Sequence, residues 1–301
     1  MSPAVALLKT VRPHQWVKNV FVAAPLVFAR HLTELDYLWR TIVAVLVFSL
    51  LSGAVYAFND VHDVAADRLH PKKKHRPIAA GHLSERGALI AAGVLAATAL
   101  AGGFALSWKL GVVATIYGTQ NIAYSLWLKH IAFVDVGSIA FGFILRVLAG
   151  AFAIGVPASL WLIICTALLA TFLGLGKRSH ELAWAEKSGG NTNTSQTRAA
   201  LSGYSLPSLR AAMYILALAT CGAYIAYTLD PHTIAMFETE RLVFSAPFVA
   251  LALARFLSLA LWRPKDESPT EAMLRDPWFL VDLAAAVATI VYVIYGHRLG
   301  G

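Results

Sequence analysis

Residues 38–76 read LWRTIVAVLVFSLLSGAVYAFNDVHDVAADRLHPKKKHR, and this stretch decides the fold class. It begins with an apolar run long enough for an α-helix to cross the hydrocarbon core of a bilayer, which is about 30 Å thick. The run ends in three aspartates, and a strongly basic segment follows directly. This order predicts a membrane helix that carries a polar site at one face of the membrane.

The acidic cluster consists of Asp60, Asp63 and Asp67. On a helix, their i, i+3, i+7 spacing places the three side chains along one stripe. Neighbouring carboxylates repel each other unless a cation lies between them, and Mg²⁺ commonly bridges a few carboxylates and substrate phosphates. We therefore expect a metal and diphosphate site here, although a polar helix end followed by a basic, topology-setting loop is the simpler alternative.

The basic segment supplies Lys73, Lys74 and Arg76 as expected ligands for phosphate oxygens that the metal leaves uncovered. Further expected contacts are scattered along the chain. Tyr124 and Lys129 come at the end of one expected helix, and Lys18 lies in the segment V-R-P-H-Q-W-V-K-N. The alternatives are an interfacial anchor for Tyr124, a snorkelling cation for Lys129 and an interfacial entry segment for the stretch that contains Lys18.

The composition places the whole chain in the membrane class. With 58% hydrophobic residues, 14% charged residues and a mean hydropathy of +0.62, the sequence is typical of a polytopic membrane protein. We expect an all-α bundle that forms a single domain over residues 1–301. Its nine transmembrane helices are predicted near residues 16–30, 38–60, 85–107, 109–129, 132–153, 158–176, 207–229, 241–262 and 277–296.

The distribution of Lys and Arg sets the expected orientation. If the N-terminus is inside, the only Lys and Arg residues of the outer segments are Arg30, Arg40, Lys109, Arg241 and Arg298, and the others lie on the inner side. This asymmetry predicts an N-in, C-out topology in a bacterial inner membrane, with active-site loops at about 61–84 and 177–206 facing the cytoplasm. The formal charge of +8 follows from this bias together with anionic membrane lipids, so no nucleic-acid partner is expected.

Charged residues inside expected helices need a specific reason, because burying a charge in hydrocarbon costs free energy. We expect Arg146 to face a polar cavity and bind an anion, and an internal ion pair with Asp135 or another carboxylate is the alternative. Beyond the sixth expected helix, Lys177 and Arg178 are also suited to phosphate. Glu181 follows four residues after Lys177, so a local pair is the alternative there.

The motif N-D-x-x-D-x-x-x-D, present at Asn59, Asp60, Asp63 and Asp67, resembles the first signature of the UbiA superfamily of membrane prenyltransferases. The resemblance implies a nine-helix bundle with a central cavity open to the cytoplasmic side, and a prenyl diphosphate held through Mg²⁺ by two aspartate-rich motifs. The chain departs from this pattern at the second motif, where Lys177, Arg178 and Glu181 stand in place of D-x-x-x-D.

Five segments together are similar to one phosphoribosyltransferase branch of this superfamily: R-P-x-Q-W-x-K-N, N-D-V-x-D-V-x-A-D-R-x-H-P, R-P-I-A-A-G, A-Y-x-x-x-L-K-H and G-K-R-x-x-E-L. The resemblance implies transfer of 5-phosphoribose from phosphoribosyl pyrophosphate (PRPP) to a polyprenyl (decaprenyl) phosphate, releasing pyrophosphate and forming a precursor of cell-envelope glycans. Mg²⁺, or alternatively Mn²⁺, would bind Asp60, Asp63 and Asp67, with Asn59 orienting an aspartate or a ribose hydroxyl.

Two alternatives follow from the same residues. The first is a UbiA-type enzyme that moves a prenyl group from a prenyl diphosphate to an aromatic or tetrapyrrole acceptor. The second is a transporter with Arg146 on its pathway. Clustering of the polar groups at one membrane face argues against transport. A homo-oligomer is compatible with the sequence.

Overall fold

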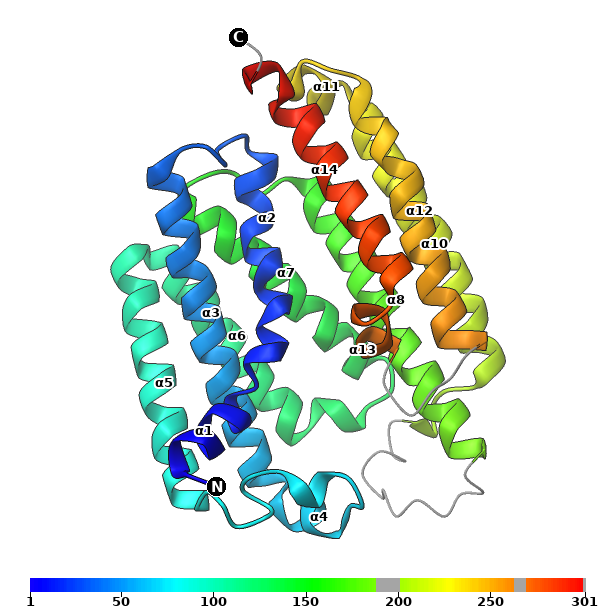
Figure 1. Ribbon diagram of the computed structural model, residues 1–301. Coiled ribbons are helices and arrows are strands. Elements are labelled where there is room, and N and C mark those ends of the chain that lie inside the picture. Colours follow the sequence, from blue (N-terminus) through cyan, green and yellow to red (C-terminus); the bar gives the residue numbers. More distant parts are fainter. Residues whose placement is uncertain (188–200, 263–268, 300–301) are drawn as a thin grey trace. The chain divides into compact units, whose positions relative to one another are not determined.

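The computed structural model describes residues 1–187, 201–262 and 269–299, and within these ranges the regular structure is entirely helical (Figure 1). Contacts between Cα atoms divide the chain into two compact units. Unit 1 contains residues 1–129 and 142–158, and unit 2 contains residues 130–141 and 159–301. Helix α7 (Val134–Ile154) contributes its first third to unit 2 and the remainder to unit 1.

Unit 1 is built around the long helix α3. Together with part of α7, its elements in chain order are α1 (Pro3–Val11), η1 (Pro13–Asn19), α2 (Val20–Phe28), α3 itself (Leu35–His62), α4 (Val64–Leu69), η2 (Lys73–His75), α5 (Glu85–Leu106), α6 (Trp108–Leu126) and η3 (Leu128–His130). Helix α3 packs against α1, α2, α5 and α6. The buried core on this helix includes Val47, Phe48 and Leu51, which pack with Leu110 and Leu145.

Unit 2 is organised around α8 (Leu160–Lys187), α10 (Leu206–Leu229) and α12 (Ala246–Leu257). Phe172, Met213 and Phe256 are fully buried where these helices meet. The remaining elements are α11 (Pro231–Phe237), η4 (Arg241–Ser245), the π-helical turn η5 (Ser258–Trp262), α13 (Pro269–Leu274) and α14 (Pro277–Leu299).

Several helices begin where the local sequence provides a cap. The Ser84 hydroxyl accepts a hydrogen bond from the Gly87 N–H at the start of α5, and Ser205 accepts one from Ser208 at the start of α10. Asp230 does the same for α11 and is followed by Pro231 at the first helical position. Each cap satisfies an N–H group that has no partner within its own helix.

One close approach between helices depends on a glycine. A Cβ atom added to Gly150 of α7 would lie 1.9 Å from the Val22 carbonyl oxygen of α2. No side chain fits in that space, so the hydrogen of Gly150 allows the two backbones to touch. This contact holds α2, and with it the preceding segment η1, against α7.

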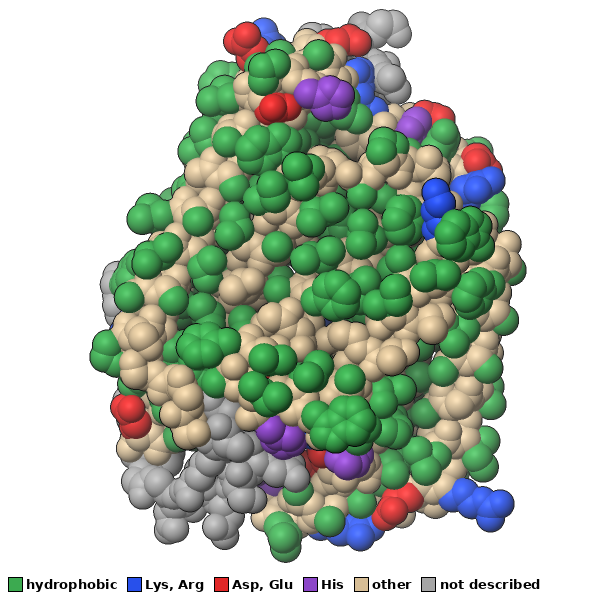
Figure 2. Space-filling model, turned by 180° about the vertical axis from the view of Figure 1, so that it is seen from behind, with side chains coloured by type: hydrophobic (Ala, Val, Ile, Leu, Met, Phe, Trp, Pro, Cys, Tyr) green, Lys and Arg blue, Asp and Glu red, His purple; other side chains and the backbone are tan. Residues whose placement is uncertain are grey.

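Seven helical segments of the described residues are long and apolar enough to cross a membrane, so the chain is an integral membrane protein. They are residues 35–62, 85–106, 134–154, 160–186, 206–229, 241–261 and 277–296. Each matches one of the predicted spans. In Figure 2 hydrophobic side chains are spread over much of the face shown, as expected for a surface in contact with lipid.

Two of the nine predicted spans are not among these seven segments. The first, near 16–30, is a 3₁₀ segment up to Asn19 followed by the nine-residue helix α2. The fourth is a helix, α6, but Thr115, Thr119, Gln120 and Asn121 reduce its hydropathy, and it is not among the seven. The loop predicted at about 177–206 begins later than expected, because α8 continues to Lys187. Residues 188–200 of that predicted loop lie outside the described part of the chain.

Candidate active site

The three aspartates lie around a break in the helix at the end of α3. The helix ends at His62, and the Asp63 N–H still donates to the Asn59 carbonyl at 2.9 Å. Helix α4 then begins at Val64 and carries Asp67, whose N–H donates to the Asp63 carbonyl at 2.8 Å. The helical repeat therefore continues through the break and keeps the aspartates at one end of unit 1.

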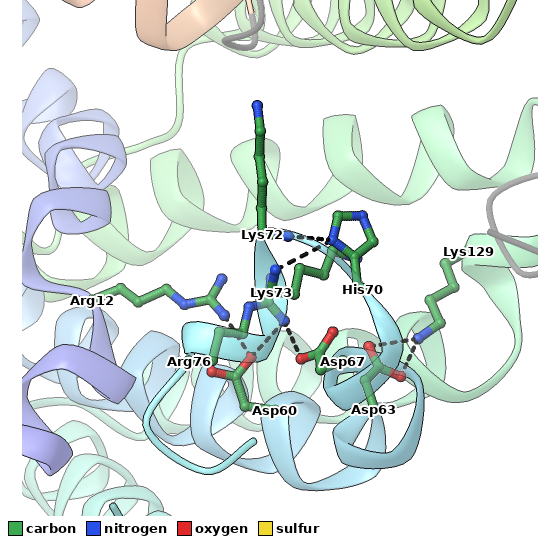
Figure 3. A network of polar contacts seen from close by, with 9 residues as sticks. All are labelled: Arg12, Asp60, Asp63, Asp67, His70, Lys72, Lys73, Arg76 and Lys129. Carbon is green, nitrogen blue, oxygen red and sulfur yellow. Dashed lines mark hydrogen bonds and ion pairs between the residues drawn. The ribbon is translucent and has the colours of Figure 1, made fainter. Parts of the chain in front are cut away.

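Two arginines bind the first and third aspartates (Figure 3). Arg76 Nη1 donates to Asp60 Oδ1 at 3.0 Å and to Asp67 Oδ2 at 2.7 Å, so one nitrogen bridges the two carboxylates. Arg12 Nη2 donates to the same Asp60 oxygen at 2.5 Å. Both carboxylates are about as buried as core residues, since 2% of each residue is exposed. The contacts are therefore only weakly screened by water.

Asp63 has a separate cation. Lys129 Nζ lies 3.0 Å from Asp63 Oδ1 and 3.3 Å from Oδ2. The three aspartates thus face three cations from three distant parts of the chain, the N-terminal segment, the loop after α4 and the end of α6. Their formal charges cancel, and we call these six residues, Arg12, Asp60, Asp63, Asp67, Arg76 and Lys129, the aspartate–cation network.

The loop that delivers Arg76 is organised by His70. Its Nδ1 atom accepts hydrogen bonds from the backbone N–H groups of Lys72 and Lys73, each at 3.2 Å. These bonds require a deprotonated Nδ1, and the pKa of His70 is accordingly lowered, first by partial burial and then by the charge of Lys73. Neutral His70 therefore stabilises the turn that leads to Arg76.

The donor set of the network fits a hard divalent cation. Asp60 and Asp67 both contact one nitrogen of Arg76, so their oxygens are close enough for a single cation to bind both. Mg²⁺ is usually held by one or two protein carboxylates together with substrate phosphates. The described residues contain no cluster of three or more His, Cys, Asp or Glu arranged as a metal cage, and Asp63 is turned to Lys129.

A second polar group lies deeper in unit 1, around Arg146 of α7. The residue is 7% exposed, and its guanidinium donates to Asn19 Oδ1 at 2.9 Å, the Gly142 carbonyl at 2.9 Å and the Tyr117 hydroxyl at 2.8 Å. Tyr117 also shares a hydrogen bond with Ser52 of α3 at 3.0 Å. Arg146 makes no ion pair with Asp135, which was the alternative considered above.

In unit 2, Arg178 is a buried structural cation. Its Nε lies 2.5 Å from Asp135 Oδ2, and its Nη1 pairs with Glu181. Tyr204 donates its hydroxyl to Asp135 Oδ1 at 2.7 Å and accepts from the Phe133 N–H, and burial raises its pKa. Arg178 is thus neutralised by two carboxylates. Lys177 beside it is exposed and lies 3.9 Å from Glu181.

The structure brings together some of the predicted residues and leaves others apart. Asp60, Asp63, Asp67, Arg76 and Lys129 lie together in one network of ion pairs, and their predicted roles toward metal and phosphate remain predictions. Lys73 and Lys74 lie in the same loop, and a substrate-binding role for Lys18 and Tyr124 remains a prediction. Arg12 was not among the predicted site residues. It does lie in the segment V-R-P-H-Q-W-V-K-N that the sequence singled out, and the structure holds it before Pro13 in a left-handed backbone conformation, with φ of 52°.

Comparison with known proteins identifies the family of this chain. The model of the UbiA prenyltransferase family matches residues 19–283. The chain belongs to the UbiA prenyltransferase family. This UbiA-family chain is 35% identical over 290 residues to the decaprenyl-phosphate phosphoribosyltransferase of Mycobacterium tuberculosis (strain CDC 1551 / Oshkosh), an alignment that covers 94% of this chain and 92% of that protein. The protein of the same name from Corynebacterium glutamicum is 31% identical over 97% of this chain and 87% of its own length.

The solved structures support the fold. A UbiA homologue from Archaeoglobus fulgidus, determined with GPP and Mg²⁺ bound, superposes with a TM-score of 0.70 at 17% identity and covers 96% of this chain and 99% of that chain. At this identity the likeness establishes the fold alone. The family and the named relatives together make this chain a membrane transferase.

Proposed function

We propose that this transferase moves 5-phosphoribose from PRPP to a polyprenyl (decaprenyl) phosphate, releasing pyrophosphate. The observation that carries the proposal is the aspartate–cation network, in which carboxylates that suit a metal lie beside cations that suit phosphates. The names of the relatives from M. tuberculosis and C. glutamicum support the choice of substrates. The product would be a precursor of cell-envelope glycans.

Asp60 and Asp67 would hold the divalent cation, with Asp63 as a third carboxylate on the same end of α3. Mg²⁺ is the proposed ion and Mn²⁺ the alternative, because both prefer oxygen ligands. When bound, the ion neutralises the negative charge that develops on the departing pyrophosphate. Asn59, one residue before Asp60, is proposed to orient a carboxylate or a ribose hydroxyl.

The cations of the network have a second task in this proposal. Arg12, Arg76 and Lys129 neutralise the aspartates before substrate binds, and all three can turn to phosphate oxygens when the metal takes their place. Arg12 and Arg76 suit this role because a guanidinium can bind two oxygens of a phosphate at once. Lys73 and Lys74 in the same loop add positive charge for the 5-phosphate.

The acceptor needs little activation. A phosphate monoester is already an anion near neutral pH, so no strong general base is required, and attack in line with the leaving group converts the α-anomer of PRPP into a β-linked product. The protein then contributes mainly by holding two anions close enough to react. In unit 2, Arg178 with Asp135 and Glu181 takes the place of a second acidic motif, which would repel the acceptor phosphate. Lys177 remains as an exposed cation.

The proposed orientation places this chemistry in the cytoplasm. With the N-terminus inside a bacterial inner membrane and nine helices in total, the aspartate end of α3 and the loop at 61–84 face the cytoplasm and line a cavity open to that side. PRPP is highly charged and cannot cross hydrocarbon without a carrier. The water-soluble substrate and the aspartate–cation network therefore belong on the same face.

The test is a pyrophosphate-release assay with purified protein, PRPP, polyprenyl phosphate and Mg²⁺. We expect release that requires all three additions and falls at least about 10²-fold in Asp60→Asn, because a lost metal ligand removes several kcal/mol of transition-state stabilisation. Geranyl diphosphate with an aromatic acceptor is the comparison arm. Turnover of geranyl diphosphate without turnover of PRPP would establish the prenyltransferase alternative instead.

A further inference from the structure

Arg146 carries a full positive charge in the interior of unit 1 without a carboxylate to balance it. All three of its hydrogen-bond partners, the Asn19 amide, the Gly142 carbonyl and the Tyr117 hydroxyl, are uncharged. Among the described residues, no Asp or Glu lies within ion-pairing distance of its guanidinium, unlike Arg12, Arg76 and Arg178. A buried charge in a membrane segment normally pairs with an opposite charge, because leaving it unpaired is costly.

The surroundings of Arg146 hold its guanidinium in one orientation. The ring of Tyr117 lies 4.8 Å from its central carbon and the ring of Phe143 lies 5.2 Å from it. Asn19 is itself fixed by a hydrogen bond from its amide nitrogen to Ser49 at 2.9 Å. A guanidinium has five N–H groups, and three hydrogen bonds leave two for a further acceptor. The Arg146 guanidinium is therefore held in one orientation with two N–H groups left to donate.

Arg146 is close to the aspartate–cation network but separate from it. Ser52, which is linked to Arg146 through Tyr117, precedes Asp60 by eight residues on α3, or about 12 Å along the helix. Tyr56 lies between them on the same helix. Its ring lies 5.0 Å from the guanidinium carbon of Arg12. A substrate complex that contacts both Arg146 and the aspartates would span about this length of α3.

We propose that Arg146 is the seat of a second phosphate group, a phosphate monoester that binds apart from the diphosphate. Asn19 and Tyr117 act as positioning residues that orient the guanidinium toward it. Each of the two substrates carries such a phosphate monoester, the lipid acceptor at its end and the sugar as its 5-phosphate. The inference rests on the proposed function, since it assumes a reaction that brings two phosphate-bearing substrates together.

A binding experiment tests this seat without turnover, metal or PRPP. The probes are farnesyl phosphate, farnesol as its uncharged counterpart, and ribose 5-phosphate, each titrated into the full-length protein in nanodiscs. We expect wild-type protein to prefer farnesyl phosphate over farnesol, and Arg146→Met to reduce this preference about 10- to 100-fold, the range for a charged hydrogen-bonding contact. Lys109→Met is the matched control, because Lys109 is an exposed cation 5.8 Å from the Phe152 ring.

The two sources give different results. Loss of farnesyl phosphate binding in Arg146→Met assigns the seat to the lipid acceptor, and loss of ribose 5-phosphate binding assigns it to the sugar. If Arg146→Met retains both affinities, the proposal is overturned and Arg146 is a packing residue. Should Arg146→Met fail to fold, Arg146→Gln decides, because it keeps hydrogen-bond donors but removes the charge, and an unchanged preference in that variant also overturns the proposal.

The same assay separates this inference from the proposed function. Asp60→Asn removes a proposed metal ligand and is expected to abolish pyrophosphate release while leaving the farnesyl phosphate preference intact. An active wild-type enzyme whose Arg146→Met variant binds both probes normally refutes only the phosphate seat. A protein that never releases pyrophosphate from PRPP refutes the proposed function.

Discussion

Replacing Arg76 by Gln should make the protein less stable without metal and more responsive to metal. Arg76 bridges Asp60 and Asp67 at 3.0 and 2.7 Å, and those carboxylates are almost fully buried. Removing one partner of a buried ion pair typically costs about 3–5 kcal/mol. The Arg76 side chain is 25% exposed and Asp60 keeps Arg12, so we reduce this range to about 2 kcal/mol.

Mg²⁺ or Mn²⁺ should then recover the lost stability, because the cation takes the position that the guanidinium leaves. By linkage, a destabilisation of about 2 kcal/mol that metal relieves corresponds to metal binding tightened about 30-fold. Mn²⁺ binding followed by electron paramagnetic resonance, without PRPP, measures this directly. Thermal unfolding at increasing Mg²⁺ gives a second reading on the same samples.

The matched control is Arg68→Gln. Arg68 pairs with Glu85 at 3.3 Å, but both side chains are about half exposed, so its loss should change neither stability nor metal affinity by more than about 0.5 kcal/mol. Pyrophosphate release should fall in Arg76→Gln even though metal binds more tightly, because the same guanidinium is proposed to contact phosphate. If the Arg76 variant binds Mn²⁺ no more tightly than wild type, the cation-exchange reasoning is wrong.

Three further outcomes follow from the contacts. Gly150→Ala should lose about 2–3 kcal/mol of stability by overpacking, measured as a lower unfolding temperature, whereas Gly137→Ala, with nothing within 4 Å of its Cβ, should be neutral. Because the pKa of His70 is lowered in the folded protein, its contribution to stability should be complete above its ordinary pKa of about 6.5. This contribution should be lost as the pH falls through the lower folded-state pKa. Thermal unfolding from pH 7 to 5 measures it, and His70→Asn should show a weaker dependence on pH. Arg178→Gln should destabilise by about 3–5 kcal/mol, because it leaves fully buried Asp135 unpaired, while Lys177→Gln should leave the unfolding temperature unchanged.

Helical periodicity and composition account for what the sequence predicted well. Seven of the expected spans match observed helices, because apolar runs of membrane length have few alternative structures. The end of α8 was missed, since hydropathy falls at Lys177 while the helical hydrogen bonds continue. Arg178 and Glu181 pair three residues apart on that continuation, which hydropathy does not detect.

The contacts between residues that are far apart in the sequence were the part of the site that was harder to predict. Arg12 reaches Asp60 across 48 positions and Lys129 reaches Asp63 across 66, so both depend on how the helices of unit 1 pack. The sequence indicated Lys129 as a cation near phosphate but gave no means to choose Asp63 as its partner. Asp135 was considered for Arg146 and binds Arg178 instead, a choice that only the three-dimensional structure resolves.

The cancelling charges of the aspartate–cation network have a consequence for turnover. In the proposed reaction, metal and pyrophosphate would leave together after the sugar is transferred, and the arginines and the lysine would return to the aspartates. Part of the attraction lost with the product would thereby be regained within the protein, which would make the departure of a highly charged product less unfavourable. A site of bare carboxylates would hold its metal pyrophosphate more tightly, whereas the proposed site would return to its paired state before the next cycle.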